Sequence, residues 1–348
     1  MTDKIAGLKR PLRCIAVVGA GIAGLSCATV LQEAGAKVRI FEKSGGTAGR
    51  MSTRRGEDWQ CDHGAQYFTA RHPRFQAELK RWLQAGVAGL WNPRITLVGG
   101  ESPRDTEERS AADMMQIDRF VGIPRMTAPG RWLADRLQVM TQTTVNQLQR
   151  RSDGWHLHSA EHAWLEERFD AVLLALPAPQ AVTLLDPQAP DLSAVARGAN
   201  MRGSWAMMLR FAAQVALPFD AAFVNSGPLR WIARDSGKPG RQGMETWVLH
   251  ANTEWSETHI EENADRVAQE LLHAFRQLGG PDPAAWTAHR WRYAHTEPAL
   301  TKLFAWDANL ELGLCGDWLN GGTVEGAWLS GRALAEQVIG SYLSLIHI

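Results

Sequence analysis

The first fifty residues combine two hydrophobic patterns around a glycine turn. Residues 14–18 are an uncharged apolar run, residues 19–24 contain three glycines, and apolar side chains then recur at helical spacing to about residue 34. Gly35 is placed as a helix C-cap, and residues 36–41 alternate as a strand does. This pattern predicts a strand, a tight turn, a helix and a second strand, which is how an α/β fold begins.

The same region also matches a membrane signal when hydropathy alone is considered. No charged residue occurs from Cys14 to Gln32, and Lys4, Lys9 and Arg10 precede this run, as in a signal peptide or a short spanning helix. The glycines argue against this alternative because they divide the run into a strand and a helix. No other stretch approaches the roughly 20 apolar residues that a bilayer requires, so we expect a cytoplasmic protein without a membrane partner.

Later segments continue the alternation of strands and helices. Residues 169–177 are a buried-strand pattern that ends in proline, and residues 142–149 and 155–158 predict a strand, a turn and a strand. Near the end of the chain, apolar positions keep helical spacing to about Tyr342. The final residues, 344–348, show no relation to this last helix.

Composition narrows the class of protein. The chain has 348 residues, of which 45% are hydrophobic and 21% charged, and this indicates a folded protein of about two domains. Its 37 basic and 37 acidic residues balance, and its 15 tryptophans lie scattered without basic interleaving, so we expect no nucleic-acid partner. The four cysteines have no metal-ligand spacing, so we expect free thiols and no metal.

The glycine turn has the GxGxxG spacing of a dinucleotide-binding site between a strand and a helix. Gly19 permits the tight turn, Gly21 lets the backbone approach a pyrophosphate, and Gly24 lets the helix pack closely on the strand. The helix N-terminus, at Ile22 and Ala23, then presents unpaired N–H groups to the phosphates. The alternative is a glycine turn that packs helix on strand without any ligand.

A second glycine-rich segment distinguishes between the two common dinucleotides. Glu42 ends the second predicted strand, where its carboxylate can accept hydrogen bonds from both ribose hydroxyls. Residues 43–52 follow it and contain Gly49-Arg50, whereas an NAD-binding domain usually continues into a helix at this point. A second glycine segment ending in Gly-Arg is typical of FAD enzymes of the amine-oxidase type, so the sequence favours FAD.

The end of the chain supplies the other half of the expected site. Residues 312–317 predict a short buried strand that ends in Gly316-Asp317, where the carboxylate can bond the ribityl or pyrophosphate region. The next helix opens at about residues 321–327, and its N–H dipoles are suited to the flavin N1/O2 end, where the reduced ring is anionic. An ordinary strand, turn and helix without ligand is the alternative here.

Short motifs that are typical of one protein family occur along nearly the whole chain. They lie at residues 19–24, 42–52, 62–71, 175–181, 246–251, 289–294, 315–318 and 324–331. Together they resemble the renalase branch of the flavin amine-oxidase superfamily, and bacterial members are the nearer ones. Ala48 departs from the pattern, because relatives usually have glycine there. Alanine fits this position if its φ is negative.

The resemblance implies an α/β fold, with a Rossmann-type, amine-oxidase-like FAD-binding domain and a second α+β substrate domain built on a mixed sheet. The FAD-binding domain is expected at residues 1–75, 120–180 and 300–345, and the substrate domain at residues 76–119 and 181–299. FAD is expected to be noncovalent, because no Cys or His stands in a flavin-attachment motif. The residues expected to bind FAD are Gly19, Gly21, Ile22, Ala23, Gly24, Glu42, Lys43, Gly49, Arg50, Met51, Val145, Gly316, Asp317, Glu325, Gly326 and Ala327.

Two departures from the amine oxidases concern chemistry. Those enzymes usually have a tyrosine beside the flavin in a Gly-Tyr-x-Glu-Gly-Ala segment, and Thr323 replaces it here. They also usually have a lysine that bonds to N5 through water, and Lys302, the candidate for this role, has no motif around it. Both departures count against a simple amine substrate, and the small Thr323 leaves room for a broad planar donor.

The renalase resemblance implies oxidation of 2- or 6-dihydro-NAD(P) to NAD(P)⁺, after which dioxygen reoxidises the flavin and gives hydrogen peroxide. A dihydropyridine becomes aromatic when it loses hydride and has no N–H that must be removed, so it needs no strong base. The sequence indeed offers no catalytic dyad or triad, and we assign no catalytic residue. The expected partners are a small-molecule donor, either a dihydronicotinamide nucleotide or an amine, and dioxygen.

The expected substrate pocket draws on separate parts of the chain. Gln66 and Tyr67 are expected near the flavin edge, and the remaining positions line the pocket. The alternative is plain core packing, since Trp291 and Tyr293 alternate as one strand face does. The expected pocket residues are Gln66, Tyr67, His250, His289, Trp291, Tyr293 and Thr323.

Two other functions remain open from the sequence. One is a flavin amine oxidase or desaturase, which needs an apolar channel, and the other is a protein whose FAD is structural or sensory. The densest basic group can meet a nucleotide phosphate or form a solvated face, and we prefer the second interpretation. This group consists of Arg54, Arg55, Arg71 and Arg74.

Overall fold

The structure is a computed structural model that describes residues 14–100, 117–186 and 188–344. The expectation about residues 344–348 therefore lies almost entirely outside the described residues. The chain divides into two compact units, each assembled from separate segments. Unit 1 comprises residues 1–49, 130–201 and 295–348, and unit 2 comprises residues 50–129 and 202–294. Residues 50–75 and 120–129, which we expected in the FAD-binding domain, belong to unit 2, and residues 181–201 and 295–299, which we expected in the substrate domain, belong to unit 1.

Unit 1 is built on a six-stranded sheet that is mostly parallel. The strand β1 runs parallel to its neighbours β2 and β12, as the buried apolar runs predict, and only β18 pairs antiparallel. This is a Rossmann-type sheet, so the predicted fold class of this part is confirmed. The strand order is β18 (Phe304–Asp307), β19 (Leu312–Cys315), β12 (Ala171–Leu174), β1 (Cys14–Val18), β2 (Lys37–Phe41) and β8 (Val139–Met140).

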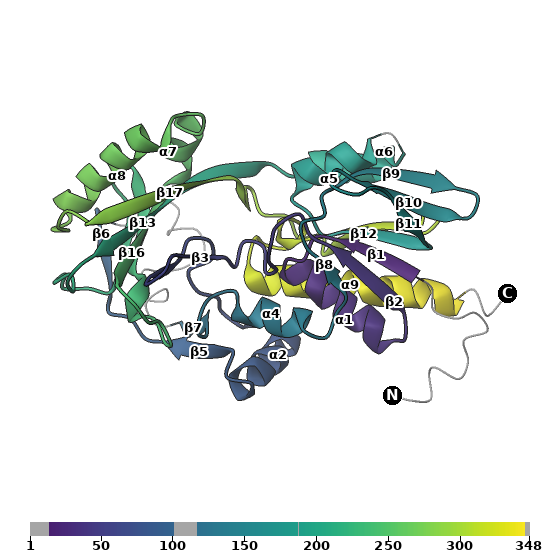
Figure 1. Cartoon of the computed structure of the whole chain (residues 1–348), viewed down its shortest axis with the longest axis horizontal. Helices are drawn as coiled ribbons and strands as arrows, with labels where there is room; N and C mark the ends of the chain where they lie inside the picture. The colour runs from purple at the N-terminus through teal and green to yellow at the C-terminus, as the bar shows by residue number, and fades with distance from the viewer. Residues whose placement is uncertain (1–13, 101–116, 187, 345–348) are drawn as a thin grey trace. The chain divides into compact units, whose positions relative to one another are not determined.

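Two layers cover the faces of this sheet. On one face the helices α1 (Ile22–Glu33) and α9 (Val324–Ser344) lie side by side (Figure 1). A core of apolar residues joins the other face to a small antiparallel sheet and to two short helices. Those elements are β9 (Val145–Arg151), β10 (Gly154–Ser159), β11 (Ala163–Phe169), α5 (Ala178–Leu185) and α6 (Pro190–Arg197).

Unit 2 contains a second six-stranded sheet of mixed direction. Its central strands pair antiparallel, whereas β6 joins its neighbour β14 in parallel, and the predicted α+β unit on a mixed sheet is confirmed. The strand order is β17 (Ala285–Thr296), β13 (Met201–Phe211), β16 (Glu245–Ala251), β15 (Leu229–Arg234), β14 (Ala221–Val224) and β6 (Ile95–Val98).

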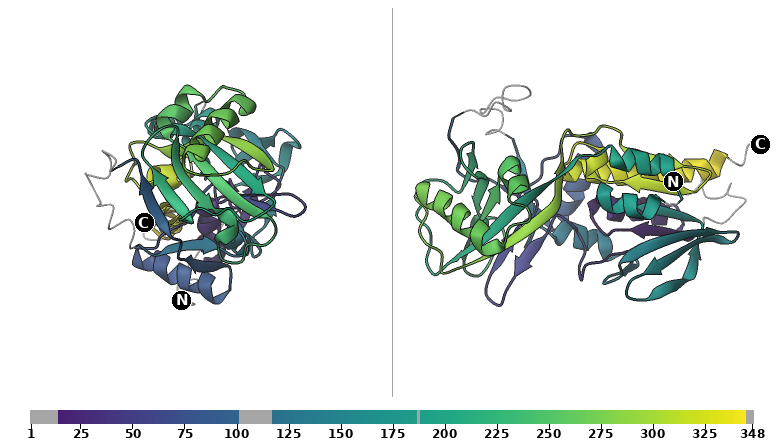
Figure 2. Two further views of the ribbon diagram at one scale, coloured as in Figure 1. Left: turned by 90° about the vertical axis from the view of Figure 1, so that its left-hand side faces the viewer. Right: turned by 90° about the horizontal axis from the view of Figure 1, so that it is seen from above.

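The two faces of this sheet carry different side chains. Helices α7 (Thr253–Thr258) and α8 (Ala264–Gln277) cover one face (Figure 2), and alternate strand residues pack with α8 into an apolar core. Because side chains alternate along a strand, the intervening residues point to the other face. Phe223, Trp231 and His250 are cross-strand neighbours there, and the buried pair Met208 and Val248 lies on the same face.

Shorter elements complete the two units. The hairpin of β3 and β4 ends at Asp62 and leads directly into the turn of residues 62–66, which is important below. Within the part of the chain that the structure describes, no helix is both long and apolar enough to cross a membrane. The shorter elements are β3 (Thr53–Arg55), β4 (Gln60–Asp62), α2 (Pro73–Gln84), β5 (Ala88–Trp91), β7 (Arg119–Gly122), α4 (Ala128–Ala134), η2 (Asp235–Gly237) and η3 (Asp317–Leu319).

The contact between α1 and α9 allows a test of the packing in unit 1. A Cβ atom on Gly331 would overlap the carbonyl oxygen of Ala23, whereas one on Gly340, in the same helix, would meet no atom. We expect Gly331→Ala to reduce the free energy of unfolding by about 1–3 kcal/mol, because the helices must move apart. Gly340→Ala should instead raise it by up to about 1 kcal/mol through helix propensity. Urea unfolding of both variants measures this, and equal effects would contradict the packing described.

Candidate functional site

The first glycine turn has the backbone that a phosphate site requires. Gly19 has a φ of +105°, and a Cβ atom there would collide with the carbonyl oxygen of Ala175 on the neighbouring loop. Gly21 is the N-cap of α1 and makes no side-chain cap, and the first turn of the helix contains no acidic residue. The first amides of α1 are therefore not capped by a side chain, and open space lies where a Gly21 side chain would be. A pyrophosphate fits this arrangement.

Glu42 stands beside this turn in the position of a ribose ligand. Its carboxylate is only 7% exposed and accepts hydrogen bonds from the backbone N–H of Ala20 and of Ser44, each at 2.8 Å. A carboxylate has about four acceptor positions, so two remain for ribose hydroxyls. The backbone N–H of Thr143 donates to the carbonyl of Glu42, and this places the strand that begins at Val145 next to the site. Lys43 is exposed at the same edge.

The second glycine-rich segment, residues 43–52, contacts the backbone of the first glycine turn. The N–H of Ala48 donates to the carbonyl of Ala20 at 2.9 Å, and Ala48 forms a parallel bridge with Gly21. Gly49 has a φ of +55° and lies against the backbone of Gly21. The structure thus brings together two glycine segments that the sequence analysis assigned to one cofactor.

Ala48 corrects one expectation. We expected alanine to fit because its φ would be negative, but its φ is +85°, in the left-handed region. An L-residue with a Cβ is strained there, and the position favours the glycine that relatives usually have. Ala48 is held in this conformation because its backbone pairs with Ala20 and Gly21, and its buried methyl group lies against Gly130 in α4.

The C-terminal half of the expected site also lies in unit 1. Gly316 follows β19 and donates its N–H to the buried hydroxyl of Ser330, and Asp317 is 9% exposed in the short helix η3. Thr323 is the N-cap of α9, because its Oγ1 accepts the N–H of Gly326 at 2.9 Å. The small residue at the position of the family tyrosine therefore also begins the helix. Glu325 and Ala327 lie in its first turn.

In unit 2, the turn of residues 62–66 gathers an aromatic group that we call the His63 group. It consists of His63, His289 and Trp291. The His63 ring stacks on Trp291 at 5.3 Å between centroids and meets His289 edge-on at 4.7 Å. The indole N–H of Trp291 also donates to the backbone carbonyl of His63 at 2.9 Å. Trp291 is half-buried, and its indole ring packs against both imidazoles of this group.

The imidazoles around this turn stay uncharged at neutral pH. Burial, and then the neighbouring His289 and Arg54, lower the pKa of His63 to about 3. Burial and Arg54 lower the pKa of His289 to about 4, and burial and Lys238 lower that of His250 to about 4. Neutral imidazoles can donate and accept hydrogen bonds, but they bring no charge to a ligand.

A buried ion cluster holds the other side of the same turn. Lys238 has no exposed side-chain surface and lies 2.7 Å from Asp235, 3.3 Å from Asp62 and 3.1 Å from the amide oxygen of Gln66. Arg241 also pairs with Asp62. Burial would raise the pKa of Asp62, but the two cations lower it to about 2, whereas burial and Asp62 raise the pKa of Asp235 to about 6.

This cluster fixes the amide of Gln66. Because Lys238 takes its oxygen, the Nε2 group donates to the carbonyls of Asp62 (2.7 Å) and Gly64 (3.1 Å) and meets Nε2 of His250 at 3.5 Å. Gln66 and His250 are thereby joined to the turn that carries the His63 group.

Three expected pocket residues are not members of the His63 group. Tyr67 packs instead with Trp91 and Trp231, under the guanidinium of Arg119. Tyr293 is half-buried on β17, and its backbone carbonyl, with that of Ala294, accepts Arg50. Thr323 belongs to unit 1. Met51, an expected FAD ligand, is buried at the start of unit 2.

The sequence analysis missed His63 and Lys238. His63 stood inside the quoted motif 62–71 but was not singled out, because a lone histidine carries no pattern. Lys238 lies in the run Asp235 to Arg241, where opposite charges recur at short spacing around glycines, and this signal could have been found. Lys302, the lysine we considered, is exposed.

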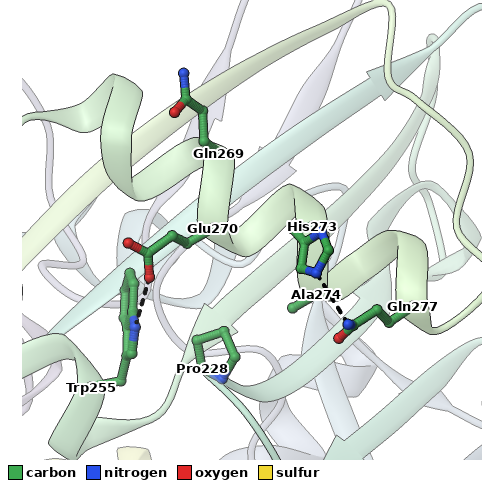
Figure 3. Close-up of a pocket in the computed structure, with 7 residues that line it drawn as sticks. All are labelled: Pro228, Trp255, Gln269, Glu270, His273, Ala274 and Gln277. Atoms are coloured by element: carbon green, nitrogen blue, oxygen red, sulfur yellow. Dashed lines mark hydrogen bonds between the residues drawn. The ribbon is translucent and has the colours of Figure 1, made fainter.

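Another concavity in unit 2 lies away from these residues. A pocket of about 320 Å³ between α7 and α8 is lined by side chains that already bond one another, Trp255 to Glu270 and Gln277 to His273 (Figure 3). Among the described residues, His259, Glu262 and Glu270 form the one group with metal-ligand spacing. The guanidinium of Arg266 pairs with both carboxylates, so it already supplies the positive charge there.

Comparison with protein families gives two matches. Residues 17–83 match an NAD(P)-binding Rossmann-like domain, and residues 113–339, more than half of the chain, match the model described as flavin containing amine oxidoreductase.

Curated relatives cover parts of the chain. An L-amino-acid oxidase from Siganus canaliculatus is 37% identical over 83 residues, which are 23% of this chain and 15% of that protein. The tRNA 5-methylaminomethyl-2-thiouridine biosynthesis bifunctional protein MnmC from Magnetococcus marinus is 26% identical over 318 residues, 77% of this chain and 44% of that protein. The chain thus spans less than half the length of both relatives.

Solved structures match over nearly the whole chain. Cyclohexylamine oxidase from Brevibacterium oxydans superimposes with a TM-score of 0.71 at 12% identity, over 96% of this chain and 100% of that one. Putrescine oxidase bound to putrescine gives a TM-score of 0.70 at 14% identity, over 94% and 99%. At these identities the likeness shows the fold.

Ala48 gives the first prediction for this site. We expect Ala48→Gly to raise the free energy of unfolding by about 0.5–1 kcal/mol, because glycine relieves the left-handed strain. The control is Ala28→Gly inside α1, which should lower it by about 1 kcal/mol. Thermal unfolding of both variants checks this, and a destabilised Ala48→Gly protein would contradict the strain.

The neutral state of His63 gives a prediction of pH dependence. Its pKa is about 3 in the folded chain and about 6.5 when unfolded, so between these values only the unfolded chain takes up the proton. Stability should therefore fall as the pH falls, by about 2 kcal/mol between pH 6.5 and 5 for this residue alone. The His63→Gln variant should not show this part of the loss of stability. Asp235 has a raised pKa, so it makes the folded chain more stable as the pH falls, and its contribution should be the same in both proteins. Urea unfolding at both pH values measures the difference, and parallel curves would exclude a buried neutral His63.

Proposed function

Because the chain belongs to the flavin-containing amine oxidoreductase family, we propose that it is a renalase-like oxidase that takes a hydride from 2- or 6-dihydro-NAD(P). Membership confirms the expected family, the FAD cofactor and an oxidoreductase enzyme. The donor, the residues that bind it and a noncovalent attachment of FAD are proposals.

The observation that carries the proposal is the uncharged, aromatic character of the His63 group. His63, His289 and Trp291 offer flat rings, and burial and Arg54 keep both imidazoles neutral. A planar dihydropyridine needs such a surface and no strong base, since loss of hydride makes the ring aromatic and leaves no proton to remove. An amine that is protonated at neutral pH, by contrast, must lose a proton before it can give up a hydride.

Residues of unit 1 fit the cofactor role. The first amides of α1, which no side chain caps, would bind the pyrophosphate. The free acceptor positions of Glu42 would bind the ribose, and the start of α9 would lie at the flavin end. FAD, when bound, would supply the two-electron acceptor, and its reoxidation by dioxygen would give hydrogen peroxide.

Thr323 supports a broad donor. It is the N-cap of α9 and is a small side chain where amine oxidases usually have tyrosine. A small residue at this position would leave more space over the flavin ring for a wide planar donor.

An amine or amino-acid oxidase is the second candidate. It is favoured by the relatives themselves, which include an L-amino-acid oxidase and a cyclohexylamine oxidase. It would require an apolar channel for the amine. The imidazoles of His63 and His289, with pKa values of about 3 and about 4, are weak bases, so another side chain would have to remove the proton of an ammonium substrate.

The proposal predicts a spectral change. Anaerobic mixing of the purified FAD protein with 6-dihydro-NAD(P) should bleach the flavin band near about 450 nm, because the ring gives up hydride to become aromatic. Air should restore the band with formation of hydrogen peroxide.

Matched donors distinguish the candidates. Failure of both the 2- and 6-dihydro isomers to bleach the flavin would exclude the proposed donor, and bleaching by an L-amino acid or a primary amine would then establish the second candidate. Ordinary 4-dihydro-NAD(P) is the control for nonspecific reduction.

A further inference from the structure

We propose that Arg54, together with the His63 group, forms an anion subsite in unit 2 that takes the phosphate of a nicotinamide nucleotide. The proposal rests on the proposed function and specifies how unit 2 would recognise the donor. It makes Arg54 a specificity-determining residue, which the sequence analysis preferred to place on a solvated face.

Arg54 has an unusual partner. It lies on β3, and its guanidinium meets Nδ1 of His289 at 3.5 Å, at the far limit of a hydrogen bond. Several other arginines of unit 2 pair with carboxylates, as Arg94 does with Asp220 and Arg234 with Glu245. Within the described residues, no carboxylate neutralises Arg54, so its charge is available to an anion.

The charge of Arg54 acts on the group beside it. It contributes to the low pKa of both His63 and His289, after burial in each case. Arg54 therefore places a positive charge beside rings that are themselves neutral. A flat ligand that carries a negative charge matches both properties, whereas a cationic amine is repelled.

A second observation points to a missing polar partner at the same place. His63 is 6% exposed, its Nε2 meets the Ser52 hydroxyl at 3.3 Å, and its buried Nδ1 has no hydrogen-bond partner in the structure. A buried polar atom without a partner costs about 1–3 kcal/mol. The half-buried His289 ring, which Arg54 contacts, meets the His63 ring edge-on, so this unpartnered atom belongs to the same group of side chains as Arg54.

The ligand class follows from these features. The aromatic rings suit a pyridine ring, and the guanidinium suits a phosphate, which it can bind through two N–H groups at once. A nicotinamide mononucleotide combines both, whereas nicotinamide riboside has the ring without the phosphate.

Calorimetric binding to the FAD-loaded protein tests the subsite without relying on turnover. Nicotinamide mononucleotide should bind the wild type about tenfold to a hundredfold more tightly than the riboside, the range expected for a charged hydrogen bond. Arg54→Met should abolish this ratio, and Arg54→Lys should restore part of it.

Arg55→Met is the matched control. Arg55 is the next residue on β3, is also exposed, and points to the opposite side of the strand. It should keep the wild-type ratio, and it controls for the general loss of one positive charge. A ratio that is absent in the wild type, or unchanged in Arg54→Met, would overturn the subsite.

Inorganic pyrophosphate separates this proposal from the proposed function. If dihydronicotinamides fail to reduce the flavin but pyrophosphate binds the wild type and not Arg54→Met, the anion subsite stands and the donor assignment falls. If they do reduce the flavin while Arg54→Met binds pyrophosphate and mononucleotide as the wild type does, the function stands and the subsite falls.

Discussion

Unit 2 depends on the carboxylate of Asp62. Its Oδ1 accepts the Thr53 hydroxyl and the Met126 N–H, and its Oδ2 pairs with Lys238 and Arg241. One side chain thus joins a hairpin, the loop before α4 and the segment after η2. Burying four ionised groups is costly, and such a cluster is retained only when every partner is present. Loss of one partner leaves a buried charge unpaired, so the cluster resists rearrangement more than it adds to net stability.

The consequence of this constraint is a rigid turn at residues 62–66. Asp62 anchors its beginning, and Gln66, oriented by Lys238, closes it through the carbonyls of Asp62 and Gly64. His63 is therefore presented from a turn with little freedom, and its ring meets Trp291 and His289 in a defined arrangement. The charges that hold the turn pair with one another, whereas the imidazoles it carries stay neutral. In the proposed site, the structural ions are thus separate from the aromatic rings proposed to contact the donor.

In unit 1, the expected cofactor site is formed mainly by backbone groups. The glycine turn at residues 19–24 brings helix amides to one point without a side chain in the way, and Glu42 receives two backbone N–H groups while it keeps acceptor positions free. Ala48 shows that this arrangement tolerates strain, since its φ of +85° is imposed by pairing with Ala20 and Gly21. The left-handed conformation was not evident from the sequence, because only the neighbouring backbone forces it.

Local pattern by itself determined the framework of this protein. The apolar runs and glycine spacing predicted β1, α1 and β2, and the glycine segment after Glu42 favoured FAD. The Gly-Asp and the helix near the end predicted a second half of the cofactor site. These features follow from short-range rules of backbone geometry and hydrophobic burial. The tertiary structure alone decided which side chains share the His63 group and the Asp62 cluster. His63 and His289, and likewise Asp62 and Lys238, are far apart along the chain, and their low pKa values or pairing arise only when folding removes water and brings the charges together.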